Sequence, residues 1–144
     1  MIKTILGFSF FLLSSCSTLK DEVISCPNVS SPKGAEEIVV KSESGLPVYM
    51  GFRGVELYCT NSGTDIHMKA SVNIRAIRKN SDDDDYVPIA ISIVSVDINN
   101  KEYDRDEFSY SQFVLKGSKI VERSTNMDLN VPNNGKVYIG IRQN

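Results

Sequence analysis

Carboxylates are the side chains of this sequence that occur in clusters dense enough to suggest chemistry. Residues 82–85 are consecutive aspartates, and a second acidic stretch, NNKEYDRDE, covers residues 99–107. A calcium cage needs six or more oxygens that converge from alternate positions or separate loops, whereas consecutive aspartates in an extended loop point in different directions. In the second stretch Lys101 stands where an EF-hand has an oxygen ligand. We therefore predict no metal site, and we interpret residues 81–85 as a solvated loop and residues 101–107 as a surface or edge strand.

Catalytic constellations are not evident in the sequence. His67 is the single histidine, which argues against imidazole catalysis and against a multi-histidine metal site. No GxSxG elbow occurs, and Gly45, Gly51 and Gly54 are spaced as turns without the GK[ST] of a phosphate-binding loop. We predict no catalytic residues and no cofactor, so the protein is not expected to be an enzyme.

The N-terminal residues have the pattern of an export signal. A positive start at Lys3 is followed by an apolar core of about nine residues and then by Ser14, Ser15 and Cys16. This apolar run is too short to span a bilayer, which needs about 20 residues. The pattern predicts a secretory signal peptide, with Cys16 either as an attachment site or as an incidental residue at its end.

The four residues at positions 13–16, LSSC, resemble the lipobox of bacterial lipoprotein precursors. The resemblance implies cleavage before Cys16 and acyl chains on its thiol, which together attach a protein stably to a membrane. Ser17, rather than aspartate, follows the cysteine, and by the same resemblance this implies delivery to the outer membrane, with the domain facing the periplasm. We thus expect a signal peptide in residues 1–15, a lipid anchor and tether in residues 16–34 and a folded domain in residues 35–144.

The other cysteines, Cys26 and Cys59, form an even pair in the oxidising compartment that export implies. A disulfide between them would close a loop of about 34 residues, which contributes roughly 3 to 4 kcal/mol in the chain-entropy model. Two buried free thiols are the alternative. The sequence has no CxxC spacing of a zinc or redox site, and exported thiols rarely stay reduced.

Period-2 alternation is the main structural signal beyond the tether. Residues 66–76 alternate apolar and polar side chains over their whole length, which predicts a half-buried antiparallel strand with His67 on the polar face. Residues 87–98 form a second long strand, in which the alternation slips by one and predicts a β-bulge between Ile93 and Ser95. Shorter strands are expected at residues 37–41, 55–59, 102–105, 119–129 and 136–142.

About seven strands with turns at short intervals, and no helical stripe, predict an all-β fold. We expect an antiparallel β-sandwich of immunoglobulin or fibronectin-III type, with a small β-barrel as the alternative. Because the chain has no tryptophan, most of its other aromatic side chains are expected in the core. An exposed patch for protein or glycan is the alternative for these residues: Tyr49, Phe52, Tyr58, Tyr103, Phe108, Tyr110 and Phe113.

Spacing also suggests a family. Cys26-Pro27, the segment GVELYC ending at Cys59, and the strands IHMKASVNIRAIR and YVPIAISIVSVDINNKE resemble a group of small alphaproteobacterial lipoproteins of unassigned function. The likeness covers residues 26–131. Where that group has a Tyr-Phe-Val-like start, this chain has Tyr86-Val87-Pro88. The resemblance implies a lipoprotein and brings no catalytic residues with it.

Net charge and the anchor together define the expected function. The formal net charge is −2 and the pI is about 5.4, which argues against nucleic acid as a partner. We expect an envelope lipoprotein that serves as a non-catalytic interaction or structural module, held at the membrane by its lipid and contacting envelope proteins. The alternative is a periplasmic carrier of a small ligand or of calcium. Convergence of residues 82–85 on Asp104, Asp106 or Glu107 would favour that alternative.

Overall fold

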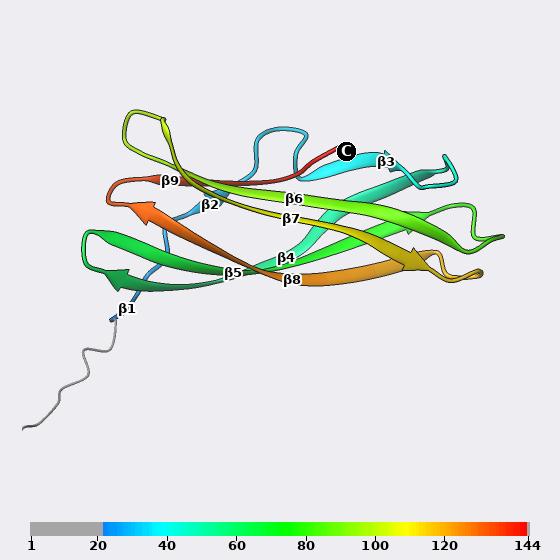
Figure 1. Ribbon diagram of the computed structural model, residues 1–144, viewed down its shortest axis with the longest axis horizontal. Coiled ribbons are helices and arrows are strands. Elements are labelled where there is room, and N and C mark those ends of the chain that lie inside the picture. Colours follow the sequence, from blue (N-terminus) through cyan, green and yellow to red (C-terminus); the bar gives the residue numbers. More distant parts are fainter. Residues whose placement is uncertain (1–21, 144) are drawn as a thin grey trace, which may run out of the picture.

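The computed structural model describes residues 22–143, which fold into two β-sheets packed face to face (Figure 1). Among these residues there is no helix long and apolar enough to cross a membrane. The strands are β1 (Val23–Ile24), β2 (Val29–Ser30), β3 (Glu37–Lys41), β4 (Pro47–Ser62), β5 (Asp65–Arg78), β6 (Asp85–Val96), β7 (Glu102–Val114), β8 (Ile120–Pro132) and β9 (Lys136–Ile141).

Sheet A has the strand order β1-β4-β5-β8, with β3 also paired to β4, and sheet B has the order β2-β9-β6-β7. Every pairing is antiparallel except that of the short β2 with β9. The sheets remain separate layers and do not close into a barrel. The predicted all-β sandwich is therefore confirmed, and its likeness to immunoglobulin domains lies in the two-layer architecture, because the consecutive strands β3, β4 and β5 share one sheet.

Strand β5 shows how the alternation builds the core. Met68, Val72 and Ile74 are completely buried, while Lys69 and Ser71 between them are exposed. Side chains of successive strand residues point to opposite faces, so this pattern places one face of β5 against sheet B. The core that results is almost entirely aliphatic.

Strand β6 differs from expectation at its end. The predicted slip between Ile93 and Ser95 is wrong, because the alternation continues and Ser95 is fully buried. A buried hydroxyl is tolerated when it is hydrogen-bonded, and the Ser95 Oγ donates to the backbone oxygen of Asn130 at 2.6 Å. The register shift falls one residue later, between Ser95 and Val96. The break in the apolar–polar pattern of the sequence therefore comes from the buried Ser95 and not from a bulge between Ile93 and Ser95.

Strand β4 is longer than the predicted residues 55–59, and two of the three glycines expected in turns lie within it. Gly45 does lie in the turn between β3 and β4, with a φ of +81°. Gly51 and Gly54 instead lie within β4, where the register shifts between Phe52 and Gly54. Glycine inside a strand commonly marks such a bulge, so the strand continues through both positions.

The expected core position of the aromatic residues is wrong. Tyr49, Tyr58, Tyr103, Tyr110 and Phe113 are between 42% and 51% exposed. Phe52 and Phe108 are only half-buried. On β4 the reason is strand parity, because Val48 and Met50 occupy the inward positions and leave the tyrosine between them on the outer face.

The paired strands begin earlier in the chain than expected. Residues 23–30 lie within the predicted tether, yet Val23 pairs with Thr60 in sheet A and Val29 pairs with Val137 in sheet B. The folded domain therefore begins before residue 35. Composition could not indicate this, because two-residue strands leave no periodicity and form only against strands that are already in place.

Candidate interaction surface

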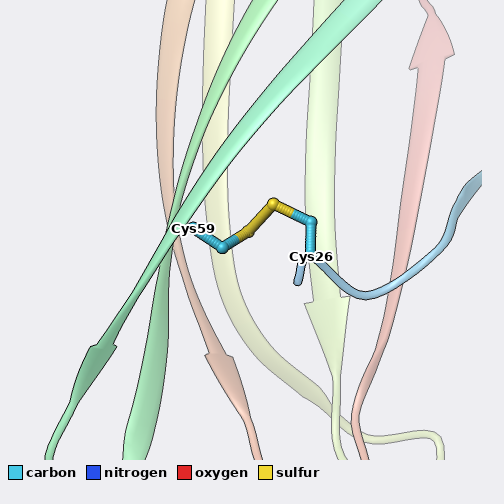
Figure 2. Close-up of a disulfide and its surroundings, with 2 residues drawn as sticks. All are labelled: Cys26 and Cys59. Carbon is cyan, nitrogen blue, oxygen red and sulfur yellow. A yellow bond between two sulfur atoms is a disulfide. The ribbon is translucent and has the colours of Figure 1, made fainter. Parts of the chain in front are cut away.

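Cys16, the predicted lipidation site, lies outside the described residues. The predicted disulfide is present: Cys26 and Cys59 are bonded, with their Cα atoms 5.3 Å apart. Figure 2 shows the bond running from Cys59 on β4 to Cys26 on the N-terminal segment. That segment crosses from sheet A at β1 to sheet B at β2, so the disulfide fastens the chain to the core at the crossing.

The acidic residues do not converge on one point. Asp85 pairs with Val114 at one end of sheet B, whereas Asp104 pairs with Ser95 near the other end. Asp82 is exposed in the loop between β5 and β6. Within residues 22–143 no group of three or more His, Cys, Asp or Glu side chains is placed to hold a metal ion. The geometric condition that would favour a calcium carrier is therefore not met.

Asp104 and Asp106 instead close one open side of the sandwich. Asp106 Oδ2 accepts a hydrogen bond from the backbone N–H of Asp128 at 2.9 Å, and Asp104 Oδ2 accepts one from that of Asn130 at 2.8 Å. These N–H groups lie on the outer edge of β8. Carboxylates on an edge strand block the pairing of further strands, and here they also occupy the neighbouring edge. The prediction that residues 101–107 guard a surface or edge strand is confirmed for β7.

His67 lies on the outer face of sheet A, as predicted. Its Nδ1 is 3.2 Å from Asn130 Oδ1, and its Nε2 is 3.3 Å from Asp128 Oδ1. The side chain is about one-third exposed. These contacts give His67 a cross-strand pairing role on a polar surface.

Asp85 is the one aspartate of the acidic run that is buried. Its Oδ1 accepts hydrogen bonds from the backbone N–H of Tyr86 at 2.8 Å and from the hydroxyl of Ser44 at 3.0 Å. Burial raises the pKa of Asp85, but hydrogen bonds from Ser42, Tyr86 and Ser44 outweigh that effect and hold the pKa below its usual value. Asp85 thus joins the β3–β4 turn to the start of β6.

Replacing Asp85 with asparagine is expected to lower the free energy of unfolding at pH 7 by about 2 kcal/mol, because charge-assisted hydrogen bonds are lost. Since the folded-state pKa is depressed, the carboxylate stabilises the fold above its unfolded-state pKa of about 3.9 and ceases to do so as the pH falls through the folded-state pKa. Urea unfolding of both proteins at a series of pH values should show the difference shrinking below pH 4. Asp82→Asn, at an exposed position, should show no difference, and a gap for Asp85→Asn that stays constant down to pH 2 would contradict this account.

Most of the exposed large hydrophobic side chains gather at one end of the sandwich. This end, which we call the distal end, carries the β3–β4, β5–β6 and β7–β8 connections. The chain enters at the opposite end, because β1 pairs with the last residues of β4 (Figure 1). The exposed side chains at the distal end are Val39, Tyr49, Ile77, Tyr86, Phe113, Leu115 and Ile120.

Arg78 holds two of the distal connections together, β5–β6 and β7–β8. Its guanidinium is buried and donates to three backbone oxygens: Ser118 at 2.7 Å, Asp83 at 2.8 Å and Leu115 at 2.9 Å. Lys116 N–H also donates to Asp84 Oδ1 at 2.6 Å, which links the β7–β8 loop to the acidic run. Arg78 and Lys116 thus link the β5–β6 and β7–β8 connections to each other.

Contiguous exposed apolar patches are candidate interaction surfaces. At the distal end Tyr49 and Ile77 lie on the outer face of sheet A, whereas Tyr86 lies on that of sheet B. Of the aromatic residues that the sequence analysis singled out, Tyr49 and Phe113 belong to the distal end, and periodicity did not indicate that they point outward. Comparisons with protein-family models, with curated proteins and with solved structures found no significant match.

Proposed function

We propose that this protein is a lipid-anchored envelope lipoprotein that acts as a non-catalytic interaction module, carried by the outer membrane and facing the periplasm. The observation that supports it best is the position of the exposed hydrophobic side chains at the end opposite to the entry of the chain. A protein attached through its N-terminus would present this end away from the membrane. The lipobox-like residues before Cys16 supply the attachment, and the Cys26–Cys59 disulfide suits an oxidising compartment.

The proposed anchor suggests a mechanical role for the disulfide. A tether that ends at a lipid pulls on the first residues of the domain, where β1 and β2 are each held by only two residues of pairing. The covalent bond from Cys26 to buried Cys59 passes that load directly into β4, one of the longest strands. The domain can then remain folded while its distal end engages a partner.

The intact mass of the full chain, expressed in a bacterium that processes lipoproteins, tests the anchor. Wild type should lose residues 1–15 and gain acyl chains, and should remain in the membrane pellet after a carbonate wash. Cys16→Ala should carry no acyl chains. A wild-type product with a free Cys16 thiol, or one cleaved at another position, would refute the lipoprotein assignment.

A further inference from the structure

Strand β8 is the last strand of sheet A, and only one end of its outer edge is closed. Along an antiparallel strand, the N–H and C=O of alternate residues point to the same edge. The N–H groups of Asp128 and Asn130 point away from β5 and donate to the carboxylates of Asp106 and Asp104. The Ser95 hydroxyl donates to the Asn130 oxygen at the same edge. This end of the β8 edge is therefore occupied.

The rest of the edge, which we call the open edge, covers residues 122–126. By the same alternation, the backbone groups of Glu122, Ser124 and Asn126 point outward, and all three residues are exposed. Among residues 22–143, β8 pairs within its sheet with β5 alone, and no hydrogen bond satisfies these outward groups. A row of unpaired backbone donors and acceptors is complementary to another extended chain.

Arg123 lies at the centre of the open edge, with its side chain on the inner side of sheet A. It shares this side with the buried Met127. Its guanidinium carbon is 3.9 Å from the centre of the Tyr110 ring and 5.8 Å from that of the Phe108 ring, both on β7. Cation–π contacts hold the guanidinium at this position. Within the described residues it has no carboxylate partner, and its Nε has no acceptor.

A cation on the inner side of an edge strand selects among the chains that can pair there. An apolar side chain opposite Arg123 would bury the charge further without a partner, which is costly, whereas a carboxylate would neutralise it. A second copy that paired through its own β8 edge would not supply this carboxylate. The inward residues beside Arg123 on that strand are Val121 and Thr125. The open edge therefore favours an acidic chain of different sequence.

We propose that the open edge binds an extended acidic segment of another protein as an additional antiparallel strand of sheet A. The backbone of this segment pairs with the outward groups of Glu122 and Ser124. Residues directly opposite each other share a face of the sheet, so an acidic side chain opposite Arg123 meets the guanidinium. The open edge is separate from the exposed side chains of the distal end. It is thus a second binding site, beyond the proposed function.

Fluorescence anisotropy of a labelled peptide, Ser-Val-Thr-Glu-Thr-Val-Ser, tests the site. Its glutamate falls opposite Arg123 and its threonines opposite Glu122 and Ser124. Two further peptides carry glutamine or lysine in place of the glutamate. The full chain is purified in detergent, which keeps it in solution with or without acyl chains. The intact mass of the same preparation therefore reports on the anchor independently of the binding result.

The glutamate peptide should bind saturably, and the glutamine peptide about tenfold more weakly, equivalent to about 1.4 kcal/mol. Arg123→Thr should weaken binding of the glutamate peptide by a similar factor. Arg123→Glu should lose the glutamate peptide and bind the lysine peptide instead. If Arg123 only protects the edge against pairing, Arg123→Thr will bind the glutamate peptide more tightly than wild type, and this result would overturn the proposal.

Two proline variants locate the bound strand. Ser124→Pro removes an outward N–H that β5 does not use, so the sheet is retained and binding should be lost. Ser109→Pro is the matched control on the edge of β7, and it should bind as wild type does. The Ser109 N–H also points outward, because the oxygen of Ala90 opposite it accepts from Arg142 on the other side of β6.

Hydrogen exchange of the wild-type chain locates the strand without any variant. The bound peptide should slow exchange at the amides of Ser124 and Asn126 and leave that of Asp128 unchanged, since the Asp128 N–H is already bonded. No binding of the glutamate peptide, binding that survives Ser124→Pro, or protection of β7 amides in place of those of β8 would overturn the proposal.

Discussion

Replacing Arg78 with methionine is expected to destabilise the domain by about 3 kcal/mol. Each backbone oxygen that loses a donor in a buried position costs about 1 to 3 kcal/mol, and Arg78 serves three of them. In the variant, water can reach some of these backbone oxygens because they belong to surface loops. We therefore expect a cost of about 1 kcal/mol for each oxygen, the lower limit of the range. Urea unfolding at pH 7 measures the loss directly.

The matched control for this prediction is Arg75→Met on the same strand. Arg75 lies on the outer face and makes a surface ion pair with Glu122. Such a pair contributes at most about 1 kcal/mol to stability. Hydrogen exchange adds a local measurement: amides of residues 79–84 and 115–119 should exchange faster in Arg78→Met and remain unchanged in Arg75→Met. If the two variants lose equal stability, Arg78 does not hold the distal connections in the way that its hydrogen bonds indicate.

Removing the disulfide with Cys26→Ala and Cys59→Ala together should lower the free energy of unfolding by about 3 to 4 kcal/mol. The bond joins residues 33 apart, and restricting a loop of this length in the unfolded chain accounts for most of the effect. For a domain of this size we expect the melting temperature to fall by roughly 10 to 20 °C.

Treatment with a reducing agent distinguishes the stability due to the disulfide bond from the stability due to packing of the cysteine side chains. Wild type with a reducing agent should melt close to the double variant, and the double variant should not respond to the reagent. Wild type that keeps its melting temperature after complete reduction, verified by alkylation of both thiols, would show that the packing of Cys59 in the core, and not the cross-link, carries the stability.

The apolar–polar pattern of the sequence was sufficient to predict the strands in which buried and exposed residues alternate strictly. Residues 66–76 alternate without a break, and β5 has its buried face where this predicts. Strand β3 has the predicted limits of residues 37 and 41. The Cys26–Cys59 pair was predicted from the cysteine count together with the expected export and the expected lipid on Cys16.

The sequence pattern predicted the wrong environment for residues that are found both in strands or cores and in turns or on surfaces. Ser95 reads as polar, and only the backbone oxygen of Asn130 on the opposite sheet makes it a core residue. Gly51 and Gly54 have the spacing of turns, and pairing with β3 and β5 at Gly51 and with β5 at Gly54 keeps them in a strand. In each case the deciding partner is distant in sequence.

Periodicity alone was enough to predict an all-β fold, with a sandwich favoured over a small barrel, and the Cys26–Cys59 pair was predicted once Cys16 was expected to carry a lipid. Strand pairing, by contrast, was needed to show that Tyr49 and Ile77 face outward in register with Val39 and Ile120. It was also needed to show that Asp104 and Asp106 close the edge of β8. Strand register is set by pairing between segments far apart in the chain, which local sequence pattern does not encode. Alternation along a strand shows which residues share a face. Which of the two faces is buried depends on how the strand pairs and packs in the sheet.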